Sequence, residues 1–84
     1  MDNYNIKHLQ HQNRFIVTNE LGVEVGKLKY DADPSNHLVI LSTEVNPEYT
    51  HQGLGTKLVQ EALDYAKNNR FEVTSTCTFA DKFI

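Results

Sequence analysis

Two features of the sequence carry residue types that can do chemistry. The first is the segment 52–56, QGLGT, in which Gly53 and Gly55 precede a run with helical spacing. Because glycine has no Cβ atom, a ligand can approach the backbone closely there, and the N–H groups at the start of a helix bind phosphate. The side chains of Gln52, Thr56 and Lys57 add further donors. The segment indicates a pyrophosphate site, although a plain tight turn explains the two glycines equally well.

The second feature is Cys77, the single cysteine of the chain. It cannot form an internal disulfide, which agrees with a reducing compartment and leaves a free thiol to be explained. A free cysteine is often no more than a small buried apolar side chain. His8 and His11 are not completed by other ligands at a suitable spacing, so we predict no metal site.

The elements that position these residues follow from the spacing of apolar side chains. Residues 14–18 and 23–30 are rich in β-branched and aromatic residues and flank a turn, which predicts a β-hairpin. The apolar phase changes within the second strand, so we expect a bulge at Gly26. Residues 37–45 contain an unbroken apolar run, which predicts a central strand that is covered on both faces and ended by Pro47.

A helix and a last strand complete the pattern. The apolar stripe that starts at Leu54 predicts a helix ending at Asn68 or Asn69, either of which tolerates a left-handed conformation. Residues 71–78 alternate between apolar and polar and are typical of a strand. A strand, a helix and a second strand in this order form a right-handed crossover with parallel strands. The expected fold class is therefore α/β.

Length and charge limit the classes of function. With 84 residues the chain is predicted to form one domain, 1–84. Its net charge of −3 and its singly scattered basic residues argue against nucleic-acid binding. No run is long and apolar enough to span a membrane, and residues 1–5 lack the features of a signal peptide. We expect a cytoplasmic protein with no membrane partner.

The residues around the glycines match a known pattern. The run 43–55, TEVNPEYTHQGLG, followed by 57–63, KLVQEAL, resembles motif A of the Gcn5-related N-acetyltransferases (GNATs). The segment 75–79, STCTF, is similar to the cysteine-containing strand of the minimal single-domain branch, so the resemblance covers residues 14–84. It implies a small mixed sheet with antiparallel N-terminal strands, one long crossover helix after the phosphate loop, and a parallel strand pair that splays apart.

The resemblance also implies a cofactor, a reaction and site residues. Coenzyme A, or acetyl-CoA, would lie where the two strands splay, and the acetyl group would pass to an amine acceptor. The residues implied to bind the cofactor are Val45, Asn46, His51, Gln52, Gly53, Leu54, Gly55, Thr56 and Lys57. Cys77 would lie beside the thioester, where it either accepts the acetyl group or contacts the CoA sulfur. Apart from the resemblance, Glu44 on the predicted central strand is the candidate base for the attacking amine, with His37 as a second candidate. The alternative for each is a structural one: a solvated carboxylate for Glu44 and a strand-edge imidazole for His37.

Four positions depart from the family pattern. Thr50 and His51 stand where an Arg and a Gly are usual in the loop, so weaker cofactor binding is expected. Ser42 and Phe83 replace a His and a Tyr of minimal members, which removes two groups for proton transfer. One alternative function is a CoA or acyl-CoA binding module without turnover. The other is a small interaction domain whose edge strand pairs with another chain. Neither the acceptor nor the oligomeric state follows from the sequence.

Overall fold

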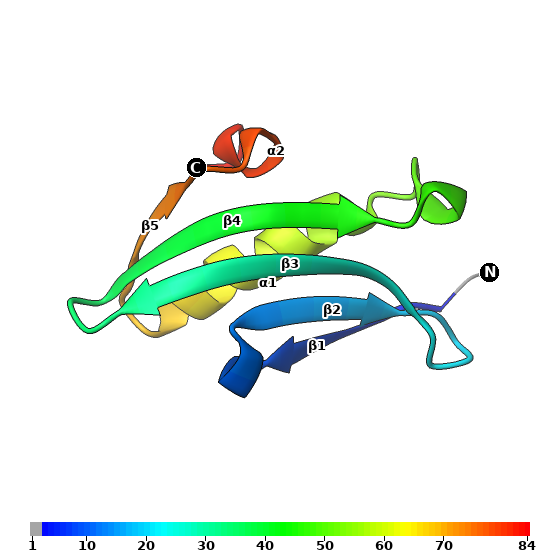
Figure 1. Cartoon of the computed structure of the whole chain (residues 1–84), viewed down its shortest axis with the longest axis horizontal. Helices are drawn as coiled ribbons and strands as arrows, with labels where there is room; N and C mark the ends of the chain where they lie inside the picture. The colour runs from blue at the N-terminus through cyan, green and yellow to red at the C-terminus, as the bar shows by residue number, and fades with distance from the viewer. Residues whose placement is uncertain (1–2) are drawn as a thin grey trace.

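A mixed sheet and one long helix make up most of the fold (Figure 1). The computed structural model describes residues 3–84; Met1 and Asp2, part of the expected domain 1–84, lie outside the described residues. In chain order the elements are β1 (Asn5–Leu9), the 3-10 turn η1 (Gln10–Gln12), β2 (Arg14–Thr18), β3 (Glu24–Asp33), β4 (His37–Val45), the 3-10 turn η2 (Pro47–Tyr49), α1 (Leu54–Asn68), β5 (Glu72–Ser75) and α2 (Thr78–Asp81).

Within the described residues the strand order of the sheet is β1-β2-β3-β4-β5. The first four strands are antiparallel, β4 and β5 are parallel, and α1 forms the crossover between them. The predicted α/β mixed sheet is confirmed. The expectation that residues 37–45 lie in the middle of the sheet is wrong, because β1, a short and largely polar strand, adds a member at the far edge and makes β3 the centre.

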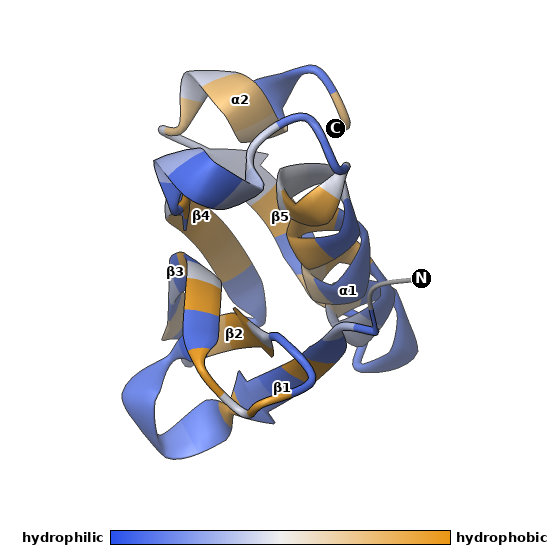
Figure 2. Cartoon of the chain, turned by 90° about the vertical axis from the view of Figure 1, so that its right-hand side faces the viewer, coloured by the Kyte–Doolittle hydropathy of each residue, from blue (hydrophilic) through white to orange (hydrophobic). Residues whose placement is uncertain are grey.

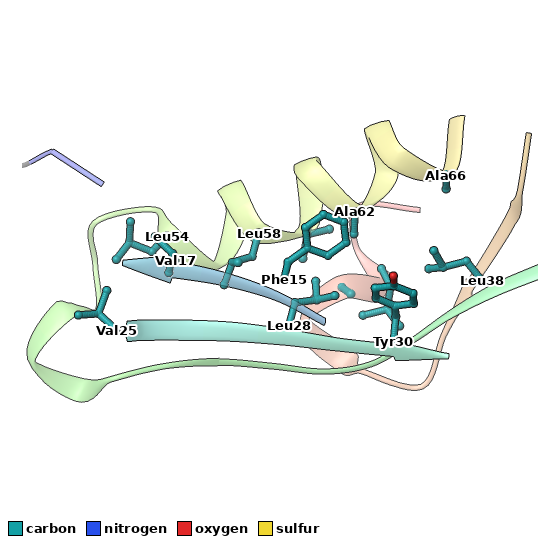
Figure 3. Close-up of a cluster of buried hydrophobic side chains, with 13 residues drawn as sticks. Phe15, Val17, Val25, Leu28, Tyr30, Leu38, Leu54, Leu58, Ala62 and Ala66 are labelled. Carbon is teal, nitrogen blue, oxygen red and sulfur yellow. The ribbon is translucent and has the colours of Figure 1, made fainter. Parts of the chain in front are cut away.

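The core lies between the sheet and α1. Leu54, Leu58, Ala62 and Ala66 recur at every fourth position, as the predicted stripe requires, and each is at most 2% exposed. They pack against inward-facing side chains of β2, β3 and β4 (Figure 3), which are Phe15, Val17, Val25, Leu28, Tyr30, Leu38 and Ile40. Full burial of an apolar side chain contributes about 1.5–3 kcal/mol. This layer therefore holds the end of β4 and the start of α1 in fixed positions on either side of the loop.

The hairpin of β2 and β3 contains the bulge expected at Gly26. The ladder pairs Val17 with Gly26, and the next pair skips Val25, which is therefore an extra residue. A Cβ atom at Gly26 would lie 2.9 Å from Val17 Cγ1, closer than side chains approach one another, so glycine is required. β3 itself extends to Asp33, three residues beyond the predicted end.

A second bulge, which the sequence pattern did not predict, lies in β4. Tyr30 pairs with Ile40 and Lys29 with Ser42, so Leu41 is the extra residue. Leu41 is 46% exposed, because α1 packs on the opposite side of the sheet (Figure 2). The expectation that β4 is covered on both faces is wrong. The uncovered side, called the open face below, carries the side chains of Lys7, Arg14, Ile16, Lys27, Lys29, Leu41, Ser42 and Glu44.

The last strand is shorter than predicted. β5 ends at Ser75 rather than at residue 78, and Thr78–Asp81 forms the short helix α2. The Ser75 hydroxyl accepts a hydrogen bond from the N–H of Cys77 and donates one to its carbonyl, both at 2.9 Å. This local pairing turns the chain away from the ladder. Cys77 therefore lies at the start of α2 and not within a strand.

The helix α1 ends at Asn68, as predicted, but a different residue takes the left-handed conformation. Asn69 has a φ of −107°, whereas Arg70 has a φ of 59°. The N–H of Phe71 bonds to the carbonyl of Ala66 at 2.8 Å, which is the long hydrogen bond of a Schellman motif. In that motif the left-handed residue follows the cap, so the position falls on Arg70 rather than on either asparagine.

Candidate active site

The loop between β4 and α1 is a tight reversal that delivers the chain to the start of the helix. Asn46 Oδ1 accepts a hydrogen bond from the N–H of Glu48 at 3.0 Å and so caps η2. His51 and Gly53 then adopt left-handed conformations, with φ values of 67° and 75°. Gly53 is the N-cap residue of α1, and glycine adopts this conformation without strain.

The start of α1 presents hydrogen-bond donors. Gly53 has no side chain to accept from the first turn, and no side chain of the described residues caps this end. The first turn of a helix leaves its N–H groups without intrahelical partners, and here they belong to Leu54, Gly55 and Thr56. These groups and the positive end of the helix dipole together suit an anion. The predicted phosphate loop therefore has the geometry that phosphate binding requires.

Polar side chains stand around this first turn. Gln52 Oε1 accepts a hydrogen bond from the hydroxyl of Tyr4 at 2.5 Å, so the amide NH₂ group remains as a donor. His51 and Lys57 are exposed, and Thr56 is half-buried. The sequence prediction grouped these loop residues, and the structure adds Tyr4, from the N-terminal segment, as the residue that orients Gln52.

A pocket of about 380 Å³ opens between this loop, the end of β4 and α2. Its lining residues are Thr43, Val45, Tyr49, Thr50, His51, Gly53, Leu54, Gly55, Thr56 and Phe79. The ring of Phe79 forms one wall, and a Cβ atom at Gly55 would lie 3.1 Å from its Cζ atom. Glycine at position 55 is therefore explained by the contact with α2, which the sequence did not reveal.

Beyond Ile40 the outer edge of β4 pairs with no other strand of the described residues, and this unpaired edge is called the gap below. β4 pairs with β5 only as far as Ile40 and Ser75. Along an antiparallel strand, successive residues direct their backbone groups alternately toward the partner and away from it. The N–H of Asn46 bonds to the Val25 carbonyl of β3 at 2.8 Å, so the backbone groups of Val45 point into the gap. Those of Asn46 do not, because its carbonyl also has a partner, the N–H group of residue 49.

Cys77 lies at the far end of this gap, next to Thr43. Its Sγ atom is 3.8 Å from Thr43 Oγ1, and the residue is half-buried. Burial raises the pKa of the thiol, but the backbone of Ala80, the hydroxyl of Thr43 and the backbones of Phe79 and Thr43 lower it, and the net pKa lies below the usual value. No N–H group of α2 completes a cap hydrogen bond with the side chain, so the α2 backbone acts as nearby dipoles. The thiol ionises more easily than that of an ordinary cysteine.

The two candidate bases lie in different places. Glu44 is on the open face, 66% exposed in its side chain, with its carboxylate 3.7 Å from Lys27 Nζ. It directly follows Thr43, so it is one residue away from the gap. His37 begins β4 and contacts Thr74 Oγ1 at 2.8 Å. Six residues of a strand span about 20 Å, which places His37 too far from Thr43 to act at the same site.

The rest of the described chain offers less for a phosphate-bearing ligand. A second pocket, of about 420 Å³, lies beside Tyr4 and Tyr49, but the carboxylates of Glu20 and Glu48 line it and would repel phosphate. Among residues 3–84 no three His, Cys, Asp or Glu side chains are grouped so that they could hold a metal ion. In the same range no helix has the length and apolar character needed to cross a bilayer.

Comparison with known proteins assigns a family to this arrangement. The family model described as GCN5-related N-acetyl-transferase matches residues 14–84, which is most of the chain. The chain belongs to the GCN5-related N-acetyltransferase family. The resemblance seen in the sequence is thereby confirmed over the range that it covered. No curated protein matches the sequence of this GNAT-family chain.

Solved structures of other proteins share the fold. A GCN5-like protein from Staphylococcus aureus, determined in solution, is 26% identical with a TM-score of 0.69, over 94% of this chain and 76% of its own. Aminoglycoside N-acetyltransferase AAC(6')-Iy in complex with CoA is 20% identical with a TM-score of 0.63, over 74% and 46%. The PaiA N-acetyltransferase from Thermoplasma acidophilum in complex with coenzyme A is 22% identical with a TM-score of 0.62, over 69% and 35%. This chain spans less than half of the last two proteins, which support the fold alone.

Three residues that surround the site were not singled out from the sequence. Phe79 follows Cys77 by two positions within the GNAT-like segment, so its proximity to the thiol offered a signal. Thr43 opens the motif, and its contact with Cys77 depends on where two separate segments meet. Tyr4 has no local signal, because it precedes the region that the family model matches.

Proposed function

We propose that this GNAT-family chain is an N-acetyltransferase that moves an acetyl group from acetyl-CoA to an amine. One observation carries the proposal: the uncapped start of α1 and Thr43 line the same pocket, and the thiol of Cys77, which does not line it, is 3.8 Å from Thr43 Oγ1. The pocket and this contact together are called the path below. A ligand with a diphosphate at one end and a thioester at the other has the matching chemistry.

The residues along the path fit such a ligand. The N–H groups of the first helical turn can bind an anion without the help of a positive side chain. Lys57 adds a positive charge, and because its side chain is exposed, bringing it to the anion costs little desolvation free energy. Val45 presents to the gap the backbone groups with which a longer β5 would have paired. The residues proposed to hold CoA are Val45, His51, Gln52, Gly53, Leu54, Gly55, Thr56 and Lys57, and Asn46 is proposed to set the shape of the loop.

The chemistry of transfer requires a leaving thiolate and a proton acceptor. When bound, acetyl-CoA supplies an acetyl group that is already activated as a thioester. In the net reaction the amine nitrogen gains a bond to the acetyl carbon and loses a proton, the bond between that carbon and the CoA sulfur breaks, and the sulfur takes up a proton. Glu44 is proposed to accept the proton from the nitrogen, through a water molecule, from its exposed position one residue beyond Thr43.

Cys77 is proposed to carry the acetyl group between the two partners. Its thiolate would attack the thioester carbon and release the CoA thiolate, and the amine would then attack the S-acetyl group and restore the thiol. The lowered pKa and the partial exposure of Cys77 support this role. A free, reactive thiol also supports our expectation of the cytoplasm as the compartment.

Intact-mass measurement after incubation with acetyl-CoA tests the proposal. We expect one added acetyl group, which peptide mapping places on Cys77, and loss of both the label and amine acetylation in Cys77→Ala. Thr76→Ala is the matched control, since it removes an exposed hydroxyl next to Cys77 and leaves both the thiol and the Ser75 turn in place. Equal transfer rates for Cys77→Ala and the parent, with no label on the thiol, would show that the amine attacks the thioester directly.

Ligand binding is tested separately by thermal unfolding. CoA at about 100 times its dissociation constant should add about 2.7 kcal/mol, which raises Tm by about 10–20 °C in a domain of this size. No shift at millimolar CoA would rule out both the enzyme and a binding module.

A binding module without turnover is the second candidate. It is favoured by the side chains at two positions where minimal GNAT members carry proton-transfer groups. Phe83 has no hydroxyl and packs on Phe79, with ring centroids 5.5 Å apart, and Ser42 replaces a histidine. CoA binding without acetylation of any amine or of Cys77 would favour this candidate.

A further inference from the structure

Four basic side chains gather on the open face, although they are far apart in the sequence. The strand register places Lys7 opposite Ile16, Ile16 opposite Lys27, and Lys27 opposite Glu44. In the adjacent row Arg14 stands opposite Lys29. Residues directly opposite in antiparallel strands share a face and lie about 5 Å apart at Cβ. Basic residues that are scattered singly along the sequence therefore come together on one face of the folded sheet.

This basic cluster, defined as Lys7, Arg14, Lys27 and Lys29, has few acidic partners. Within the described residues its one ion pair joins Lys27 to Glu44 at 3.7 Å. Arg14 has its Nε atom buried without a hydrogen-bond partner among the same residues, and a buried donor of this kind calls for an acceptor.

Two acidic side chains of the same face, Glu24 and Glu44, lie beside Lys27, and the others stand at its far end. Asp31 and Asp33 follow Lys29 along β3, and Glu72 faces the start of β4 from β5. Around the cluster the four basic side chains therefore outnumber the two acidic ones, whereas acidic groups prevail at the far end. A net charge of −3 for the whole chain makes this local excess of cations a specific feature of the face.

The basic cluster borders the proposed transfer site. Lys27 and Lys29 stand opposite Glu44 and Ser42, the two residues that flank Thr43. Thr43 Oγ1 is 3.8 Å from the sulfur of Cys77. The lysines are therefore one strand away from the end of the gap. The pocket on the helix side would be filled by the CoA arm, so an acceptor has the open face as its route to the thiol.

We propose that the acceptor is an acidic amine, meaning an amine on a peptide with flanking carboxylates, and that the basic cluster docks it on the open face. This inference rests on the proposed function and adds the substrate class. Lys29 and Arg14 bind the flanking carboxylates, and Glu44 faces the amine. Exposed charges of this kind act mainly by raising the rate at which the peptide meets the enzyme and by aligning it on the face. Salt screens both effects, so the preference is strongest at low salt.

The test compares two peptides in acetyl transfer at low salt. Both carry a single free N-terminal amine, and they differ only in having Glu or Gln at the flanking positions. We expect kcat/KM to be about tenfold higher for the Glu peptide, with the ratio falling toward one in 0.5 M salt. Lys29→Glu should remove the preference. Lys67→Glu, which makes the same charge change on the exposed side of α1, should keep it, and Lys29→Gln should give an intermediate ratio.

Each outcome separates this inference from the proposed function. Equal or faster transfer to the Gln peptide would overturn the acidic acceptor and leave the acetyltransferase standing. If CoA binds while neither peptide is acetylated, the test is the NMR chemical shifts of backbone amides when the Glu peptide is added to the CoA complex. Shift changes at Ile16, Lys27 and Lys29 support docking on the open face. Their absence overturns it. A dimer in sedimentation that Lys29→Glu dissociates would assign the open face to a second copy and overturn the proposal.

Discussion

The two ends of α1 are built in opposite ways. At its start, Gly53 supplies no cap side chain and the neighbouring His51 is exposed in a left-handed conformation. At its end, the Schellman motif uses the free carbonyls, and Asn69 donates a side-chain hydrogen bond to the carbonyl of Tyr65 at 2.8 Å. One end leaves backbone groups for a ligand, and at the other the carbonyls of Tyr65, Ala66 and Lys67 are all paired.

Aromatic packing follows the same division. Around the end of α1 the ring of Tyr65 lies 4.4 Å from His8, 6.0 Å from Phe15 and 5.7 Å from Phe71, measured between centroids. At the start of α1 the main aromatic contact is the edge-on pair of Tyr4 and Tyr49 at 6.3 Å. In a small domain with few kcal/mol to spare, stability resides at the end of the helix so that its start can remain available for binding.

The largest effect should come from Tyr65→Ala. Removing a ring that contacts several others should lower the free energy of unfolding by about 3 kcal/mol, because the remaining rings cannot close the space. Urea unfolding measures this loss, and CoA titration of the folded fraction should give an unchanged dissociation constant. Tyr49→Ala is the counterpart at the other end and should weaken CoA binding more than stability. The reverse ranking of the two variants would remove the division between the ends.

Gly53→Ala should weaken CoA binding about tenfold, because a side chain at a φ of 75° strains the loop that positions the donors. Calorimetric titration measures this change. Gly22 in the β2–β3 turn has a φ of 81° and, like Gly53, no atom within 4 Å of an added Cβ. Gly22→Ala and Gly53→Ala should therefore each lower the free energy of unfolding by about 1–2 kcal/mol, and Gly22→Ala should keep its CoA affinity. Similar affinity losses in both variants would mean that general destabilisation, and not the loop, is responsible.

Arg70→Gly should stabilise the protein by about 0.5–1 kcal/mol. Its φ of 59° suits glycine at the position after a helix cap, and the arginine side chain is exposed. Thermal unfolding should show a Tm a few degrees higher, with CoA affinity unchanged. Asn13→Gly, at a φ of 52°, should gain less because asparagine already tolerates this conformation. A lower Tm for Arg70→Gly would indicate an unrecognised role of the guanidinium.

The smallest effect concerns pH. His8 stacks on Phe15 with centroids 4.0 Å apart, its Nε2 atom is 2.6 Å from the hydroxyl of Tyr30, and burial lowers its pKa. Burial raises the pKa of Tyr30 to about 12, with Tyr65 adding to the shift, so Tyr30 stays neutral throughout this range. The unfolded chain then binds more protons than the folded chain just below pH 6.5, and stability falls as the pH drops through that window.

Thermal unfolding between pH 7.5 and 5.5 measures this loss, and His8→Gln should reduce it. His11, exposed and close by in the sequence, provides the control, since His11→Gln should leave the profile unchanged. An identical pH profile for parent and His8→Gln would mean that His8 does not lose a proton on folding.

Most of the fold could be predicted because local patterns and tertiary structure agree. The stripe from Leu54 defines α1, and the phase change at Gly26 indicates the bulge. Both patterns lie within residues that are close together in the sequence, so the sequence shows them directly. β1 was missed because its five residues alternate weakly and owe their conformation to pairing with β2. The end of β5 was missed because Ser75 competes for backbone groups that alternation alone assigns to the ladder.

The candidate site could be predicted only in its contiguous part. Gln52, Gly53 and Gly55 are adjacent in the chain, so a motif identifies them. The contact of Phe79 with Gly55 and the convergence of lysines on the open face depend on which segments meet in space. The sequence explained Gly55 by a ligand, and the structure adds a second reason, since a Cβ atom there would crowd the ring of Phe79 at 3.1 Å.

The bulge at Leu41 connects the gap to a difference in length between two paired strands, β3 and β4. From Gly26 to Asp33 and from His37 to Val45, β4 has one more residue than the stretch of β3 that it pairs with. A strand with surplus length bends, and it does so next to Ile40, where pairing with β5 stops. Deleting Leu41 would leave every other side chain of β4 on its present face, so all lining residues would survive. Two strands of equal length can run straight, so β4 would no longer bend beside Ile40, and the Ser75 turn alone would keep β5 from continuing alongside.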